Sequence, residues 1–464
     1  METVRDLRPW LAEKLSGRDP GPPTTLEAFQ RVHEARGRAP AAVTQTVLDA
    51  YLRYLSLEWL RESTHVQTEA IEARDRAPWL LSQDATCAAQ AWGALRWKTD
   101  GAERERLLSA LRTHNKTLEG LFIDRAHTAQ KAAAELGHEN AARLWGETPE
   151  QEKVSAGARQ LLARTEDAYQ DLSGYFSKRV SSVRSFQTLK HIGASALPPG
   201  ASALSGVVRA VDDWSAQMGL LSPRLLRREN FSASDAPWAS HAVDFGAPHQ
   251  VLWRRVLGDG IDCAVELLAS CADAQRLLSA DPDDAPEAGR LIHPDVGEAY
   301  RQLFADLLCE EAWISRFLEV SRQSARELAR LGQFARLLLA RSHAARTLHF
   351  LANREGAMST VGFEALAEQL SLAWQTEFPK ELAPREWDAG GASATWLKGA
   401  MLAGALTQKL REAFGEDFFR NPAAGAWLTS RFRQGARVSG ETLDERRATT
   451  LESTVTAWLE RLER

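Results

Sequence analysis

Apolar residues recur at intervals of three and four positions along most of this chain, the spacing that gives a helix one apolar face. One clear case lies between residues 48 and 59. The apolar positions there are Leu48, Tyr51, Leu52, Leu55 and Trp59. Because this period dominates the sequence, a mainly α fold is predicted.

Three further segments carry a helical pattern. Thr148, Pro149 and Gln151 stand in the order of a capped helix start, and one helix is predicted from there through Phe176. A long helix rich in Ala, Leu and Arg is predicted over about residues 324–353. A last helix is predicted over residues 451–462.

A period of two appears in one short region. The segment from His241 to Phe245 alternates, and a Gly-Ala-Pro turn separates it from the segment Gln250 to Arg254. These segments predict a small sheet at about residues 237–257, followed by a helix over residues 261–278. Loops rich in proline, glycine or aspartate are predicted at residues 193–206 and 281–286.

The length and composition indicate the number of subdomains, the class of partner and the cellular location. A chain of 464 residues is longer than one compact core needs, so two or more subdomains are expected. The 57 basic and 62 acidic residues are interspersed without a basic run, which disfavours nucleic acid as a partner. We see no signal peptide and no apolar run long enough for a membrane span, so a cytoplasmic protein without membrane contact is expected. Four cysteines without a C-x-x-C pair are typical of reduced thiols.

No complete metal-binding or nucleotide-binding motif is present. In H-E-x-x-H, two histidines one helical turn apart hold a zinc ion, and the glutamate lies beside the metal-bound water. The pairs His33-Glu34 and His138-Glu139 are followed by glycine and alanine where the second histidine belongs. The sequence also lacks a P-loop, a G-x-G-x-x-G motif and a G-x-S-x-G motif.

Three stretches are similar to parts of one known family, within about residues 45–460. They are Leu221–Glu229 with the strand-like segment after it, Gly297–Phe304 with Ala312-Trp313, and Trp396–Met401 continuing through Phe414–Gly425. Together they resemble the oligoendopeptidase F and thimet-oligopeptidase-like zinc metallopeptidases, which are mostly helical gluzincins. The resemblance implies a two-lobed helical clamshell around a substrate channel, with the small sheet beside the catalytic helix.

The resemblance also implies where the catalytic residues belong. The order of strands, motif helix, loop and third-ligand helix is kept. Glu266 corresponds to the general base and Glu298 to the carboxylate ligand. The two histidine positions are occupied by Val265 and Ala269, which have no lone pair to offer a metal. No metal or other cofactor is therefore expected.

A second part of the implied catalytic apparatus is missing. The family has a His and Tyr cluster near the C-terminus that stabilises the oxyanion, and residues 388–395 contain neither residue type. The family also has a substrate-contacting loop near the position of Gly390 and Gly391. We divide the chain into an N-terminal helical lobe, residues 1–192, and a peptidase-like region, residues 193–464, with a degenerate zinc helix at 261–278.

Ordinary structural roles compete with this interpretation. Glu266 fits a solvent-facing or ion-paired glutamate, and Glu298 fits a helix N-terminal glutamate stabilised by the helix dipole. A metal site rebuilt from His241, His249 and His293 around Glu298 is a further alternative.

Three functions are compatible with the sequence. The first, which we predict, is a peptidase-derived pseudoenzyme that binds a peptide or protein partner, with Gln250 to Trp253 pairing with an extended peptide. The second is a repurposed, metal-independent enzyme acting on a small molecule or peptide in the channel. The third is a zinc peptidase with unorthodox ligands. The sequence does not specify an oligomeric state.

Overall fold

The computed structural model describes residues 2–15, 20–39, 42–79, 87–97, 100–145, 148–180, 185–193, 204–220, 225–230, 241–256, 260–352, 360–388, 391–440 and 456. In these ranges helices predominate, and one sheet has three short strands. The predicted mainly α class with a small sheet is therefore confirmed. The predicted channel between two lobes stays a prediction.

The chain folds into two compact units that alternate along the sequence. The first unit consists of Met1–Glu58, Ala196–Gly332 and Lys398–Thr454. The second consists of Trp59–Ser195, Gln333–Leu397 and Val455–Arg464. One change of unit, at Ser195–Ala196, lies close to the boundary predicted between residues 192 and 193. The division into two functional domains stays a prediction.

The first unit contains the sheet and the helices around it. The N-terminal helices are α1 (Glu2–Asp6), α2 (Arg8–Leu15), α3 (Thr25–Gly37) and most of α4 (Ala42–Ser63). The later helices are α12 (Leu204–Gln217), α13 (Ile261–Ser279), α14 (Pro286–Gly289), α15 (Pro294–Ala305), η1 (Asp306–Cys309), α16 (Glu311–Phe317), the start of α17 (Arg322–Ala352), most of α19 (Ala392–Phe414), η3 (Phe418–Arg420), α20 (Pro422–Phe432) and η4 (Gly435–Arg437).

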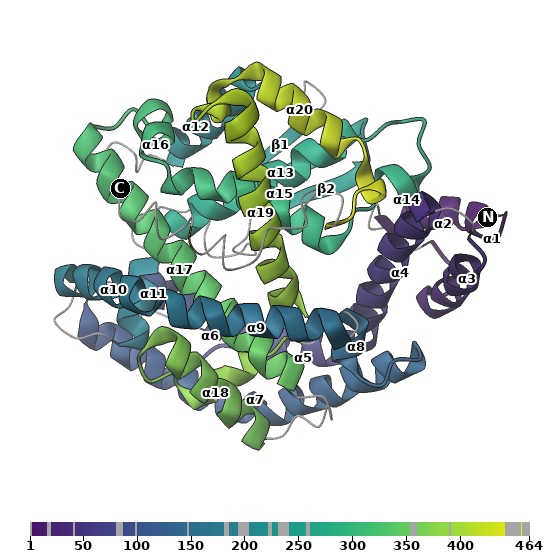
Figure 1. Ribbon diagram of the computed structural model, residues 1–464. Coiled ribbons are helices and arrows are strands. Elements are labelled where there is room, and N and C mark those ends of the chain that lie inside the picture. The colour runs from purple at the N-terminus through teal and green to yellow at the C-terminus, as the bar shows by residue number, and fades with distance from the viewer. Residues whose placement is uncertain are drawn as a thin grey trace. The chain divides into compact units, whose positions relative to one another are not determined.

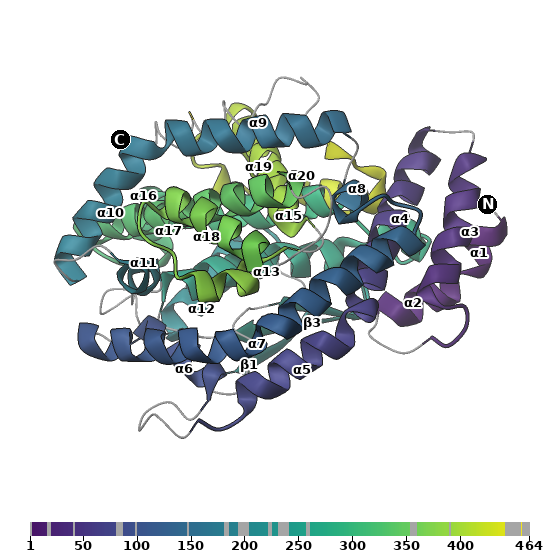
Figure 2. The same ribbon diagram turned by 90° about the horizontal axis from the view of Figure 1, so that it is seen from below.

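The second unit is helical throughout its described residues. Its elements are the end of α4, α5 (His65–Arg76), α6 (Ala88–Trp97), α7 (Gly101–Glu135), α8 (Ala141–Trp145), α9 (Thr148–Arg164), α10 (Glu166–Val180), α11 (Phe186–Gly193), most of α17, α18 (Thr360–Trp374), η2 (Lys380–Glu386) and the start of α19. The long helix α7 packs against α5, α6 and η2, and Figure 2 shows α5, α6 and α7 in one layer.

The sheet has the order β1-β3-β2, with β3 in the centre. β1 (Leu225–Asn230) is parallel to β3 (Gln250–Val256), and β2 (His241–Gly246) is antiparallel to it. The predicted strands β2 and β3 are confirmed. β1 was not expected as a strand, because two leucines followed by four polar residues have no period of two.

Helix α13 is the centre of the first unit. It packs against β2 and β3 on one side and along α15 on the other (Figure 1). Alternate residues of β3 are buried, namely Val251, Trp253 and Arg255. Because α13 is covered by a sheet and by helices, most of its residues are apolar. Little solvent-exposed surface is left on this helix for its polar side chains.

The predicted helices compare well with the observed ones, with one exception. Helices α4, α13 and α17 confirm the predictions for their segments. The single helix predicted from Thr148 to Phe176 is instead two helices that meet at Thr165. The buried guanidinium of Arg341 donates to the carbonyl of Leu162 at 2.7 Å and to Oγ1 of Thr165 at 2.8 Å, which satisfies acceptors at the end of α9.

The closing helix over residues 451–462 falls outside the described residues, except for Thr456. In the described part of the chain, no helix combines the length and the apolar character that a membrane crossing requires.

Candidate functional site

The candidate site lies in the first unit, where α13 and α15 face each other. The two positions predicted to have lost histidines are hydrocarbon side chains in the core: Val265 is 7% exposed and Ala269 is 5% exposed. Glu266 is half-buried beside them. Glu298 is on α15, one turn after the start of that helix at Pro294.

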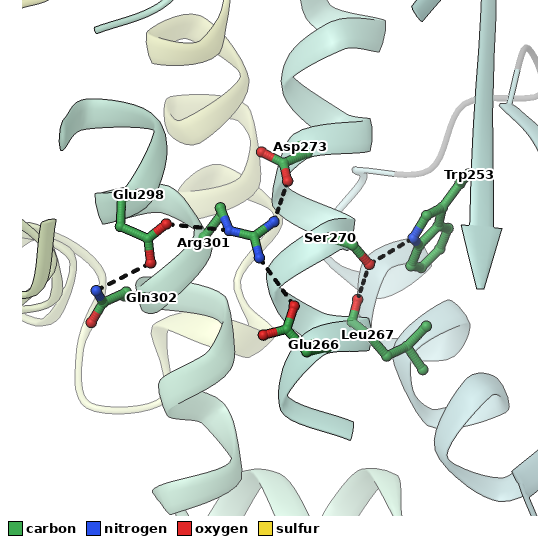
Figure 3. Close-up of polar contacts among 8 residues, drawn as sticks. All are labelled: Trp253, Glu266, Leu267, Ser270, Asp273, Glu298, Arg301 and Gln302. Carbon is green, nitrogen blue, oxygen red and sulfur yellow. Dashed lines mark hydrogen bonds and ion pairs between the residues drawn. The ribbon is translucent and has the colours of Figure 1, made fainter. Parts of the chain in front are cut away.

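Arg301 joins the two helices through three carboxylates, one for each of its nitrogens (Figure 3). Nε lies 3.3 Å from Oε2 of Glu298, on the same helix. One terminal nitrogen lies 3.1 Å from Oε2 of Glu266, and the other donates to Asp273, both on α13. The ion-paired interpretation of Glu266 is therefore confirmed.

The charge of Arg301 is strongly favoured by this setting. Burial lowers the pKa of the guanidinium, but Asp273, Glu298 and Glu266 together outweigh it, so the pKa lies above its ordinary value. Charge-assisted hydrogen bonds of this kind also fix the orientation of the planar guanidinium. Arg301 therefore acts as a permanent cation between the helices.

The helical spacing explains why these four side chains meet. Glu298 and Arg301 are three residues apart on α15, so they are neighbours on one face. Glu266 and Asp273 are seven residues apart on α13, which places them on one face two turns apart. Arg301 and Asp273 were not among the predicted site residues, although both spacings are present in the sequence.

Glu298 is held in place from two sides. Gln302, one turn further along α15, donates from Nε2 to Oε1 of Glu298 at 3.2 Å. Gly399 of α19 touches it so closely that a Cβ there would lie 2.7 Å from Cγ of Glu298. The neighbouring residue Lys398 forms an ion pair of 2.9 Å with Asp295. Burial alone would raise the pKa of Asp295, but the charge of Lys398 holds it below its usual value.

Trp253 ties the sheet to α13. Its side chain is fully buried, and Nε1 donates to Oγ of Ser270 at 2.9 Å. The Ser270 hydroxyl in turn donates to the carbonyl of Leu267 at 3.0 Å (Figure 3). This connection sets the position of α13 against β3.

The pairing of β3 with its neighbours conflicts with the predicted binding role of Gln250 and Trp253. β3 is paired along both of its sides, with β1 and with β2, so it offers no free edge to an extended peptide. The edge-pairing interpretation of these residues does not fit this sheet. Any other contact of Gln250 or Trp253 with a ligand stays a prediction.

In the stretch 388–395, the described residues are Asp388 and those from Gly391 on, and α19 begins at Ala392. Asp388 accepts hydrogen bonds from two backbone N–H groups there, those of Ala392 at 3.0 Å and Ser393 at 2.6 Å. Gly391 has φ of +71°, and a Cβ there would lie 2.8 Å from the ring of Trp145. Gly390 lies outside the described residues, and contact of this loop with a substrate stays a prediction.

The histidines proposed for a rebuilt metal site have other surroundings. His293 precedes α15 and donates from Nε2 to the carbonyl of Thr46 at 3.0 Å. His249 is exposed, and the side chain of His241 is outside the described part. Among the side chains that the structure describes, no group of three or more His, Cys, Asp or Glu is arranged to hold a metal ion.

The residues of the candidate site do not fit a zinc ion. Val265 and Ala269 supply hydrocarbon where a zinc ligand needs a nitrogen, oxygen or sulfur atom. Glu266 and Glu298, the two positions that keep carboxylates, both form ion pairs with the guanidinium of Arg301. The arrangement is a salt-bridge network rather than an open set of metal ligands.

Other titratable groups with shifted pKa lie on α17 in the second unit. The ring of His343 stacks on Trp396 with centroids 4.6 Å apart. Burial, and after it the charges of Arg346 and Arg336, holds the pKa of His343 well below its usual value. Burial also lowers the pKa of His349 to about 4. These histidines are neutral at physiological pH.

The second unit has a pocket of about 280 Å³ between α7, α18 and η2. Two glutamates that line it are ion-paired: Glu364 lies 2.9 Å from Lys380, and Glu381 lies 2.9 Å from Arg112. Neither Glu266 nor Glu298 lines it. This pocket is therefore separate from the candidate site.

Comparison with solved structures gives three informative likenesses. A putative oligoendopeptidase F is 12% identical, with a TM-score of 0.67, covering 100% of this chain and 84% of the other. Metallocarboxypeptidase 1 of Trypanosoma cruzi is 13% identical, with a TM-score of 0.54 and coverage of 100% and 91%. The M32 carboxypeptidase of Deinococcus radiodurans R1 is 12% identical, with a TM-score of 0.55 and coverage of 94% and 88%.

These likenesses concern the fold. No protein-family profile and no curated protein matches the sequence. The fold of the chain is nevertheless similar over nearly its whole length to oligoendopeptidase F-like and M32 carboxypeptidase structures. The fold predicted from three short stretches is thus supported.

Proposed function

We propose that this protein is a peptidase-derived pseudoenzyme that binds a peptide or a protein partner without zinc-dependent hydrolysis. The observation that carries the proposal is the bridge from Arg301 to both Glu266 and Glu298. It involves the two carboxylates that correspond to the general base and to the third metal ligand.

The bridge removes the chemistry that these positions would supply. A general base needs a carboxylate within hydrogen-bond reach of the attacking water. Oε2 of Glu266 is instead engaged by the guanidinium of Arg301 at 3.1 Å. The hydrocarbon side chains of Val265 and Ala269 cannot hold a metal that would activate a water.

Binding of a peptide or protein is supported by the scaffold. The solved structures with this fold include peptidases and carboxypeptidases, whose substrates are peptides. A fold can keep its binding surface while its catalytic residues are replaced, because the two depend on different side chains. This support is one of fold and does not identify the partner.

The two other functions have less support. A repurposed metal-independent enzyme would be favoured by two carboxylates available to a ligand, but Glu266 and Glu298 are engaged by Arg301. A zinc peptidase with unorthodox ligands would need converging donors, and the described side chains form no such group.

The test measures hydrolysis and binding on the same purified full chain. Quenched fluorescent peptides of mixed sequence report cleavage, with and without added zinc, and anisotropy of labelled peptides reports binding. We expect saturable binding of at least one peptide class, no cleavage, and no effect of a zinc chelator. Cleavage that depends on stoichiometric zinc would overturn the loss of catalysis, and no peptide binding would overturn the peptide-binding role.

A further inference from the structure

The loss of the metal site involves more than two missing histidines. In a metal centre, the ion compensates the negative charge of its carboxylate ligands. Here three carboxylates converge, and Arg301 supplies the positive charge among them. We propose that Arg301 is the resident cation of this site and that its guanidinium weakens metal binding even where the two histidines are introduced.

The geometry supports this role because all three nitrogens of the guanidinium form ion pairs. Each of its three nitrogens has its own carboxylate, from Glu298, Glu266 and Asp273 (Figure 3). A metal ligated by Glu266 or Glu298 requires carboxylate oxygens at roughly 2.0–2.6 Å from the ion. Arg301 lies against Oε2 of both carboxylates, so a metal that binds these two oxygens would have to displace it.

The charges of these four side chains also favour Arg301 as the resident cation. Three carboxylates that converge repel one another, and this repulsion is poorly screened where side chains are only 20–36% exposed. One cation among them reduces the repulsion. Arg301 does so without any dependence on solution metal, because a guanidinium cannot be deprotonated in a protein.

Packing also resists the departure of Arg301. Glu298 is fixed by Gln302 and by its contact with Gly399, so it cannot follow a moving arginine. Asp273 is on the opposite helix and holds the other end of the guanidinium. A shift of Arg301 would break three ion pairs at once.

The experiment restores the histidines with and without Arg301. The test proteins are Val265→His/Ala269→His and the same double variant with Arg301→Ser. A matched control adds Arg326→Ser to the double variant, because Arg326 is an arginine of the same unit that pairs with Glu311 at 3.1 Å and is 62% exposed. Zinc per chain is measured after equilibrium dialysis, and affinity is measured by competition with a chromophoric chelator.

The expected result is specific to Arg301. The variant without Arg301 should bind one zinc ion per chain, roughly tenfold or more tightly than the double variant and the Arg326 control, a factor equivalent to about 1.4 kcal/mol. Equal zinc affinity of the double variant and the variant lacking Arg301 would overturn the proposal. The readout is metal content, so the proposal can fail while peptide binding stands, and the reverse.

A second experiment avoids the new histidines, which enter a packed helix and can prevent folding. Wild type, Arg301→Ser and Arg301→Lys are titrated with terbium, a hard cation that binds carboxylates, and emission is excited through the tryptophans. Far-UV circular dichroism checks the fold of each. We expect emission to rise only for Arg301→Ser, because lysine keeps the cation. Equal emission from all three proteins would contradict the role of Arg301.

Discussion

Gly399 of α19 and Glu298 of α15 are in such close contact that a Cβ on Gly399 would lie 2.7 Å from Cγ and 2.8 Å from Cβ of Glu298. A backbone atom of Glu298 is also within 3.1 Å of that position. The helices can approach this closely only because position 399 has no side chain. The carboxylate bound by Arg301 therefore owes its position to a glycine on another helix.

We predict that Gly399→Ala destabilises the protein. The added methyl group must displace Glu298 or separate α15 from α19, and overpacking of this kind costs about 1–3 kcal/mol. Urea unfolding followed by circular dichroism measures the loss. The control is Gly120→Ala on α7, where a Cβ meets nothing within 4 Å. Alanine there should stabilise by about 0.5–1 kcal/mol, because it favours a helix over glycine. A neutral Gly399→Ala variant would contradict the close contact.

The hydrogen bond between Trp253 and Ser270 gives a second prediction. Ser270→Ala leaves the buried Nε1 of Trp253 without its acceptor, and we expect a loss of about 1–3 kcal/mol in unfolding free energy. Trp253→Phe removes the donor as well. In a double-mutant cycle, Ser270→Ala should therefore cost less in the Trp253→Phe background. Equal costs in both backgrounds would show that the hydrogen bond contributes nothing.

Glu386 gives a pH-dependent prediction in the second unit. Burial alone would raise the pKa of Glu386, but Arg346, which forms an ion pair with it, and Lys190 outweigh burial and hold the pKa below its usual value. A lowered pKa means that the ionised form stabilises the fold above the unfolded pKa of about 4.3, and that this stability is lost as pH falls through the folded pKa.

Glu386→Gln should therefore cost about 1–3 kcal/mol near neutral pH, and progressively less below about pH 4. Unfolding free energies of both proteins across this range provide the measurement. Glu364→Gln is the control, because its pair with Lys380 is exposed, and it should cost less than about 1 kcal/mol at any pH. A constant difference between wild type and Glu386→Gln would contradict the prediction.

His349 should make the stability of the fold sensitive to acid at higher pH than Glu386 does. Burial lowers its folded pKa to about 4, while an unfolded histidine titrates near about 6.5. Because the unfolded chain binds the proton more tightly, stability falls as pH drops from about 6.5 toward 4, by a total of roughly 3 kcal/mol. His349→Gln should remove this slope, and His127→Gln, at an exposed position of α7, should keep it. Parallel pH profiles for all three proteins would show that His349 is not responsible.

The sequence predicted those features that depend on local patterns. The apolar period identified α4, α13 and α17, and the period of two identified β2 and β3. Burial of one face places apolar residues at regular intervals along the sequence, so these elements can be recognised locally. The sequence missed the break at Thr165, because Arg341, which satisfies acceptors there, lies 176 positions away along the chain. No local pattern records such a partner.

The candidate site was predictable only where it depends on the residue types of one helix. The sequence indicated that Val265 and Ala269 cannot hold a metal, and that Glu266 could be an ion-paired residue. It did not identify Arg301 as the partner, because that depends on how closely α15 approaches α13. Glu298 is also in contact with Gly399 of α19, a helix that is distant in the sequence.

The alternation of the two units along the chain has a practical consequence. Three of the changes between units fall inside continuous helices, at Glu58–Trp59 in α4, Gly332–Gln333 in α17 and Leu397–Lys398 in α19. Proteases cut exposed, locally unfolded segments and spare intact helices. Limited proteolysis should therefore not release either unit at these three points, and neither unit can be obtained by shortening the chain from one end.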